Sequence, residues 1–236
     1  MTKPFAVLLG RNALLPRVVP FLVFFALTFC QGQVGEASRY WIYLLKTLVG
    51  AWMVWAVWDL VAECRWKFSW ESIAIGVLVF VIWVGLDRFV PSLNELMIQF
   101  GLSKPKEKPE LPWNPHAFFG QNSALAWFFI AVRILGSSIV VPPLEETFYR
   151  SLIYRSIANP NFEQQPLNRF HATGFFATAV IFGLAHNEWL AGILCGMAYQ
   201  WLVIRKGRLG EAMTAHAITN ALLGVWIVSQ GAWKFW

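Results

Sequence analysis

Long apolar segments that are nearly free of charged residues recur along the whole chain. The sequence predicts eight of them as membrane-spanning helices, because an apolar run of about 20 residues crosses a bilayer as a helix. They cover residues 18–35, 40–61, 72–90, part of 111–141, 142–157, 170–186, 189–204 and 212–231. No run alternates polar and apolar positions as a membrane β-barrel requires. We therefore predict an all-α protein, a polytopic transmembrane helical bundle of about eight spans.

One polar segment interrupts this pattern, at residues 92–123. Its centre, residues 104–110, reads KPKEKPE, and prolines among several charges do not form a buried helix. We predict a short interfacial helix near residues 93–102. The chain then divides into an N-terminal three-span region (1–91), the polar connection, and a five-span region (124–236).

Composition agrees with a membrane protein and excludes several other classes. Of the 236 residues, 57% are hydrophobic and 14% charged, against roughly 25% charged in soluble domains. An ordinary soluble enzyme, a disordered chain and a disulfide-rich secreted module are therefore excluded. The net charge of +6 fits attraction to anionic membrane lipid, and no basic patch interleaved with aromatic residues predicts nucleic-acid binding.

Two groups of basic residues indicate the orientation in the membrane. Lys3, Arg11 and Arg17 precede the first apolar segment, which lacks a small-residue cleavage site and is interpreted as an uncleaved span. The connection at residues 205–208 is also basic, and both groups favour the cytoplasmic side. Eight crossings cannot place both groups on one side, because the connection would follow seven spans. The orientation is left open at this point.

Charged residues gather in the apolar segments of the second half, where each is costly. A helix predicted to begin at Pro142 carries Glu145, Glu146 and Arg150. Glu146 and Arg150 are four residues apart and can pair. Two adjacent carboxylates resist simultaneous ionisation, so one of them could accept a proton from water. The alternative is a structural ion network without chemistry.

Two further spans carry histidine. His186 closes one apolar segment, and a lone histidine there is more often a satisfied core group than a catalytic one. His216 and Asn220 share a helical face and could stabilise an oxyanion, help to hold a metal, or join two helices by hydrogen bonds. With the glutamates, these residues fall on three spans within about 75 residues. One hydrophilic cluster inside the bundle is the simplest interpretation.

The order and spacing of these motifs resemble those of the CPBP intramembrane proteases, the family of CAAX prenyl proteases and bacteriocin-processing relatives. The matching patterns are Glu-Glu-x-x-x-Arg at 145–150, Phe-x-x-x-His at 182–186 and His-x-x-x-Asn at 216–220. The resemblance covers residues 125–228. The final segment, 231–236, resembles that of the CAAX-protease-related subgroup that accompanies PEP-CTERM and exosortase systems of Gram-negative bacteria.

The resemblance implies a multi-pass endopeptidase of the bacterial inner membrane. In that scheme Glu145 and His186 activate a water, His216 and Asn220 stabilise the oxyanion, and Glu146 with Arg150 holds the site together. No cofactor is expected. Other accounts of the family place a divalent metal such as zinc at the site, and its ligands here would be Glu145, His186 and His216. The partners implied are membrane lipid and a membrane-anchored protein or peptide substrate.

Two other functions remain as alternatives. The chain could be a non-enzymatic accessory or immunity factor, or a small transporter with a polar site at mid-membrane. Ser137, Ser138 and Cys195 are interpreted as structural, because no nucleophile motif surrounds them. Arg133 is interpreted as an ion-pair partner or a snorkelling side chain. Glu188, which follows His186 closely, is a weaker candidate for the cavity.

Overall fold

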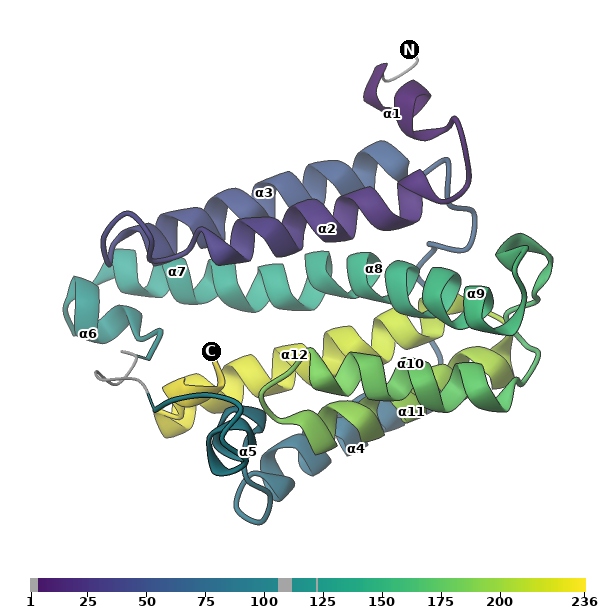
Figure 1. The fold of residues 1–236 in the computed structure, drawn as a ribbon. Coiled ribbons are helices and arrows are strands. Elements are labelled where there is room, and N and C mark those ends of the chain that lie inside the picture. The colour runs from purple at the N-terminus through teal and green to yellow at the C-terminus, as the bar shows by residue number, and fades with distance from the viewer. Residues whose placement is uncertain (1–3, 106–111, 122) are drawn as a thin grey trace.

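The computed structural model describes residues 4–105, 112–121 and 123–236. Within these ranges the chain forms helices and no strands, which confirms the all-α class. Seven long helical stretches lie side by side and alternate in direction (Figure 1). They are α2 (Leu15–Phe29), α3 (Ser38–Val57), α4 (Trp70–Leu86), the continuous helix Ala124–Ala158, α10 (Ala172–Leu184), α11 (Trp189–Lys206) and α12 (Leu209–Gln230).

Short helices cap the ends of this bundle. They are α1 (Pro4–Leu9), α5 (Leu93–Gln99), α6 (Pro115–Phe119) and two 3₁₀ turns, Phe162–Gln164 and Trp233–Phe235. Helix α5 agrees with the interfacial helix expected near residues 93–102. We call the end of the bundle where α2, α4, α10 and α12 begin the first face, and the end where they stop the second face. In Figure 1 the first face is on the right and the second on the left.

Three helices in the described part of the chain are long and apolar enough to cross a membrane: Ser38–Val57, Ala124–Ala158 and Leu209–Gln230. Helices α2, α4 and α10 are apolar but shorter. The membrane-bundle expectation is thus supported by these helices, whereas the predicted count of eight spans is not confirmed.

The expected helix break at Pro142 is wrong. The helix runs without interruption from Ala124 to Ala158, in the pieces α7 (Ala124–Leu135), α8 (Val141–Glu146) and α9 (Tyr154–Ala158) joined by two π-helical segments, Gly136–Val140 and Thr147–Ile153. A proline removes a backbone donor and crowds the preceding turn. The wider π-helical turns beside the prolines accommodate both effects, and such turns are frequent at functional sites. The fourth and fifth predicted spans are therefore one helix.

Local sequence signals set several helix ends. Ser69 and Ser92 begin α4 and α5 with reciprocal capping boxes, and the Ser123 hydroxyl accepts a hydrogen bond from the Ala126 N–H at the start of α7. Gly207 ends α11 with φ of +65°, a left-handed conformation that favours glycine. The resulting tight turn brings α12 straight back beside α11.

Small residues bring several helices of the bundle close together. A Cβ atom on Gly183 of α10 would lie 2.6 Å from the Trp189 carbonyl oxygen, and one on Gly76 of α4 would lie 2.6 Å from the Ala215 carbonyl oxygen of α12. Close approach at small residues is a usual way for membrane helices to associate. Helix α4 of the N-terminal region therefore packs directly on the helix that carries His216.

An ion network closes the bundle at the first face. Glu63, in the loop after α3, pairs with Arg17 of α2 at 2.6 Å and with Arg155 of α9 at 3.3 Å, and the Ser151 hydroxyl also donates to it. Arg17 and Arg155 are both buried. The network ties three separate segments of the chain together at the first face.

Candidate functional site

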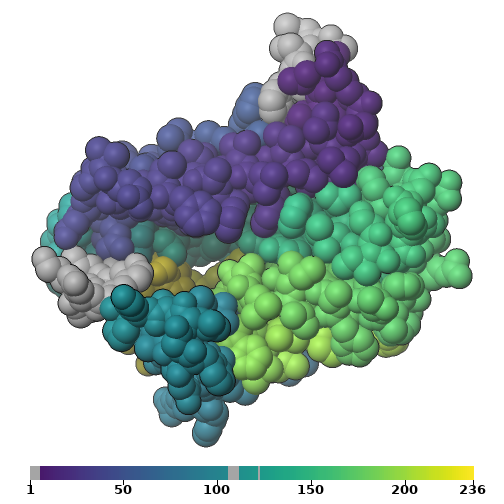
Figure 2. Space-filling view, viewed as in Figure 1, coloured from purple at the N-terminus to yellow at the C-terminus, as the bar shows by residue number. Residues whose placement is uncertain are grey.

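A cavity of about 620 Å³ lies inside the bundle, between α2, α3, the continuous helix, α10 and α12. Glu145, His186, His216 and Asn220 all line it. The surface is hollowed between α2 and the green helices below it, and α12 is visible at the back of the opening (Figure 2). Three phenylalanines of α2 line this side of the cavity, namely Phe21, Phe24 and Phe25.

The helix lengths place Glu145, His186 and Asn220 at similar depths in the bundle. Glu145 lies 13 residues before the end of its helix at Ala158, and α10, which ends just before His186, has 13 residues. Each distance is about 20 Å from the first face at 1.5 Å per residue. Asn220 lies 11 residues into α12, which is about 16 Å from the same face.

The two adjacent glutamates occupy different environments. Glu146 is fully buried, and its Oε2 lies 3.2 Å from Nε of the equally buried Arg150. Arg150 also donates to the Gly196 carbonyl at 3.5 Å, and its guanidinium lies 4.4 Å from the Phe182 ring centroid. Glu145 instead lines the cavity, and its buried Oε2 has no hydrogen-bond partner in the described structure. Glu145 is thus the member of the pair that lies on the cavity wall.

The hydrogen bond of His186 determines which of its nitrogens faces the cavity as an acceptor. Its Nδ1 lies 2.7 Å from the Phe182 carbonyl oxygen, which only accepts, so in the neutral ring Nδ1 carries the proton. The Nε2 atom is then unprotonated and free to accept. Trp83 and Phe182 flank the ring, at centroid distances of 5.4 and 4.7 Å, and fix its orientation.

His216 and Asn220 are held by partners on the continuous helix. His216 Nδ1 lies 2.9 Å from Glu146 Oε1, and its ring stacks on Tyr199 with a centroid distance of 5.4 Å. The Asn220 amide donates one hydrogen to the Ser137 carbonyl at 2.8 Å. The second amide hydrogen has no partner in the described structure. Glu146 therefore links Arg150 and His216 behind the cavity, while Asn220 retains one donor.

A three-ligand metal site does not form from these side chains. Although Glu145, His186 and His216 line one cavity, the described residues contain no group of three or more histidine, cysteine, aspartate or glutamate side chains placed to hold a metal ion. Metal-dependent hydrolysis therefore gains no support from the arrangement of the described side chains.

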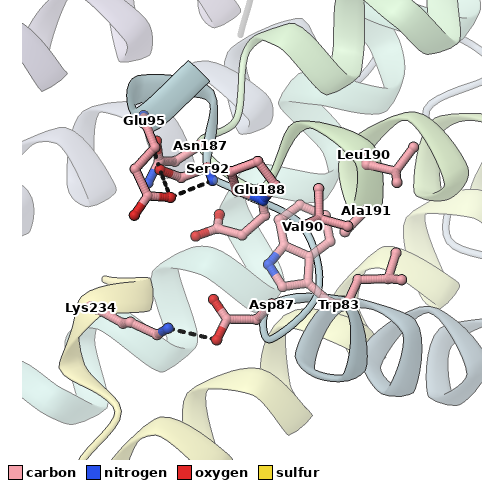
Figure 3. Close-up of a pocket in the computed structure, with 12 residues that line it drawn as sticks. Trp83, Asp87, Val90, Ser92, Glu95, Asn187, Glu188, Leu190, Ala191 and Lys234 are labelled. Atoms are coloured by element: carbon pink, nitrogen blue, oxygen red, sulfur yellow. Dashed lines mark hydrogen bonds and ion pairs between the residues drawn. The ribbon is translucent and has the colours of Figure 1, made fainter. Parts of the chain in front are cut away.

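A second pocket of about 260 Å³ adjoins the first near the second face, and Asn187, Glu188 and Trp83 line both. Figure 3 shows the carboxylate of Glu188 directed into the same space as Asp87 and Glu95. Asp87 pairs with Lys234 at 2.6 Å. Burial, with the negative charge of Asp87 adding to it, raises the pKa of the Glu188 carboxyl. This pocket gives the mouth of the cavity an acidic rim.

Sequence reasoning did not place two basic residues of the cavity in the site. Lys46 and Arg133 both line it. Arg133 contacts no carboxylate in the described structure; its guanidinium lies among aromatic rings, so the ion-pair interpretation is wrong. Both residues are charged positions inside apolar segments, which is a signal that could have singled them out.

The comparisons with known proteins concern the second half of the chain. Residues 125–222 match the family model described as type II CAAX prenyl endopeptidase Rce1-like. No curated protein and no solved structure matches the chain. The matched range contains the motifs of all three spans and leaves the N-terminal helices outside. Residues 125–222 are therefore similar to the Rce1-like CAAX prenyl endopeptidases, in agreement with the family resemblance seen in the sequence motifs.

Proposed function

We propose that the protein is an intramembrane endopeptidase that hydrolyses a peptide bond of a membrane-associated protein by means of a water activated by Glu145. The observation that carries this proposal is the single cavity that Glu145, His186, His216 and Asn220 line together. The opening between α2 and α10 supports a membrane-bound substrate, because a chain lying in the bilayer could reach the cavity from the side.

In the proposed reaction, one water donates its hydrogens to Glu145 and to Nε2 of His186, and its oxygen attacks the scissile carbonyl carbon. Glu145 takes a proton from the water as the new C–O bond forms. When the C–N bond breaks, that proton passes to the leaving amine. Glu146 and Arg150 are positioning residues in this scheme, since they lie behind the cavity wall and orient His216.

The developing oxyanion would be stabilised from α12. The free amide hydrogen of Asn220 faces the cavity, and His216, when protonated on both nitrogens, donates from Nε2. Fixed donors in a water-poor site stabilise a transition state more than they do in water.

Asn220→Ala is therefore expected to lower turnover by about 10²–10³-fold, as for the loss of one oxyanion donor. The Michaelis constant should change little, because the contact is made mainly in the transition state. Steady-state kinetics on a cleaved peptide would measure this, with Asn159→Ala, in a loop outside the cavity, as the matched control. An Asn220→Ala enzyme with wild-type turnover would remove the residue from the mechanism.

The activity itself is tested by comparing peptide ends in cell membranes. Membranes from cells that produce the wild type are compared with membranes from cells that produce Glu145→Ala at equal level. We expect specific N- and C-terminal ends that are present only with the wild type, and they would also identify the substrate. Equal sets of ends would favour an accessory or transport function.

We also propose that the protein lies in the bacterial inner membrane with its first face in the cytoplasm. With one crossing fewer than expected, the N-terminal basic residues and the connection at 205–208 come to the same face. Lysine and arginine favour the cytoplasmic side of a membrane. Among the described lysines and arginines near helix ends, nine lie at the first face and four at the second. The nine are Arg11, Arg17, Arg65, Lys67, Arg155, Arg169, Arg205, Lys206 and Arg208, and the four are Arg39, Arg88, Lys104 and Lys234. The cavity, which opens toward the second face, would then open away from the cytoplasm.

The native cysteines allow a direct test of this orientation. Cys30 is exposed just after α2, at the second face, whereas Cys64 and Cys195 are buried. In intact cells a membrane-impermeant maleimide is expected to label Cys30. A Cys30→Ser, Arg208→Cys variant should be labelled only after the membrane is permeabilised. The reverse pattern would place the cavity mouth in the cytoplasm.

A further inference from the structure

The segment that follows α12 folds back over the second face of the bundle, and we call its residues, 231–236, the strap. Gly231 ends α12 with φ of +63°, a left-handed conformation that turns the chain sharply, and the 3₁₀ turn Trp233–Phe235 follows. In Figure 1 the end of this segment, marked C, lies between α7 and α12. Lys234 of the strap lines the pocket with the acidic rim, so the strap lies beside that pocket.

The strap lies between the outer pocket and the cavity. Lys234 lines the outer pocket of about 260 Å³, whereas Phe235 and Trp236 line the cavity that holds Glu145. The Lys234 ammonium lies 2.6 Å from Oδ2 of Asp87, at the end of α4 (Figure 3). Because consecutive residues of the strap belong to two adjoining spaces, the strap forms part of the partition between them.

Aromatic contacts join the strap to both sides of the cavity. Phe235 packs on the core cluster to which α4, α11 and α12 contribute, and its ring centroid lies 5.4 Å from that of Trp226. Trp236 packs on the other cluster, to which α3 and α7 contribute, with its ring centroid 5.4 Å from that of Trp113. Two consecutive side chains therefore connect the helices on one side of the cavity to those on the other.

The strap is held in this position almost entirely by side chains. Within the described ranges, none of its backbone hydrogen bonds reaches another element than α12: the Ala232 N–H donates to the Ile227 carbonyl of α12, and the others stay inside the strap. The Lys234 side chain is 63% exposed, and an exposed ion pair contributes little stability in water. A segment held in this way can open at a small cost in free energy. The strap can therefore move about Gly231 while the helices stay in place.

We propose that the strap is an inhibitory gate, which closes the cavity at the second face and opens when Lys234 separates from Asp87. Hydrolysis consumes a water molecule and produces two polar ends, and both water and product must cross between the cavity and the aqueous phase. The rings of Phe235 and Trp236 form the wall of the cavity on that side. The inhibitory role rests on the proposed protease function, whereas the closure itself does not.

Closure is tested by the rate at which a thiol inside the cavity is labelled from water. The full-length protein in nanodiscs carries Cys30→Ser and Leu223→Cys, and Leu223 lines the cavity. Membrane-impermeant methanethiosulfonate reagents modify the thiol, and intact mass spectrometry follows the rate. Lys234→Glu replaces the ion pair by two like charges and removes no atom from the cavity wall, since Lys234 lies outside it. We expect labelling to become about five- to tenfold faster, because the rate follows the fraction of open protein.

Three controls separate opening of the strap from other effects of the substitution. Lys234→Glu combined with Asp87→Lys restores an ion pair, so the rate should return to that of the starting protein. A cationic and an anionic reagent are used in parallel, because a change of local charge alone would speed one and slow the other. Lys206→Glu, which alters the pair of Lys206 with Glu71 at the first face, should leave the rate unchanged.

A second labelling position guards against a fault of the first. Val141→Cys places the thiol on the continuous helix, where Val141 also lines the cavity. Protein with Cys30→Ser alone gives the background from the two buried native cysteines. Equal labelling of the starting protein and Lys234→Glu at both positions would overturn the gate. An increase that Asp87→Lys does not reverse, or that only the cationic reagent shows, would also overturn it.

The inhibitory role has its own measurement. The kcat/KM of Lys234→Glu on a cleaved peptide should rise by about the same factor as the labelling rate, because both follow the open fraction. Faster labelling without faster cleavage would overturn the inhibitory role. The protease function is judged separately: if no peptide ends in cells depended on Glu145, that function would fail, while the labelling rates would still decide whether the strap closes the cavity.

Discussion

Glu145→Gln is expected to lower the turnover of a cleaved peptide by about 10²–10⁴-fold, the usual contribution of a general base. The substitution keeps the size of the side chain but replaces a carboxylate, which can take up a proton, by an amide, which cannot do so near neutral pH. Glu145 is the member of the adjacent pair that lines the cavity, and its Oε2 is buried without a partner in the described structure. Steady-state kinetics on a peptide identified from the membrane comparison would measure the loss.

A matched control separates loss of chemistry from a change in the fold. Glu71→Gln alters a glutamate that pairs with Arg205 outside the cavity, and we expect it to leave turnover within a factor of two of the wild type. Because Glu145 forms no ion pair in the described chain, Glu145→Gln should unfold at the wild-type temperature. If the stable Glu145→Gln protein turned over peptide at the wild-type rate, another group would have to activate the water.

The gathering of the polar motifs into one place could be predicted from the sequence. Glu145, His186 and His216 are each costly in an apolar helix, and a shared cavity reduces that cost for all of them. The four-residue spacing of Glu146 and Arg150 likewise predicted an ion pair, and in the structure Glu146 Oε2 lies 3.2 Å from Arg150 Nε. These inferences depend only on helical periodicity and on the cost of burying charge. The catalytic roles of the residues remain proposals.

The path of the chain through Pro142 and Pro143 could not be predicted in the same way. Local rules favour a helix start at a proline pair, whereas the structure carries the helix through on two π-helical segments. The neighbours that stabilise this form come from distant positions: Gly50 and Gly136 both lie against other helices, and a Cβ on Gly50 would lie 2.8 Å from Val140. This one misplaced helix start added a span to the predicted count. With that extra span, the two basic groups could not be placed on the same side of the membrane.

Lys46 and Arg133 were missed as residues of the cavity for a related reason. The rings around Arg133 come from residues 43, 113 and 236, which lie far apart in the chain. No local pattern indicates that an arginine and a lysine in different spans share the ring of Tyr43. Contacts of this kind become visible only when the N-terminal helices are placed beside the residues that match the family model.

Arg150 and Glu146 form a buried ion pair behind the cavity. Removal of Arg150 is the substitution from which we expect the largest loss of stability. Arg150→Ala should lower the free energy of unfolding by about 3–5 kcal/mol, because it leaves Glu146 buried without its cation. The variant also loses the contact of the guanidinium with Phe182. For a chain of this size the loss corresponds to a fall of roughly 6–20 °C in the unfolding temperature, which thermal unfolding in detergent would measure.

A double variant shows whether the stranded charge causes the loss. Arg150→Met combined with Glu146→Gln removes both charges and keeps the volume, so it should recover much of the stability that Arg150→Met alone loses. Activity should not recover with it, since the glutamine holds His216 less firmly than the carboxylate that now contacts Nδ1 at 2.9 Å. Recovery of stability without activity would separate the structural contribution of the pair from its positioning of His216. An Arg150→Ala protein as stable as the wild type would show instead that burial of Glu146 does not depend on this cation. Glu146 would then be held by its contact with His216 alone.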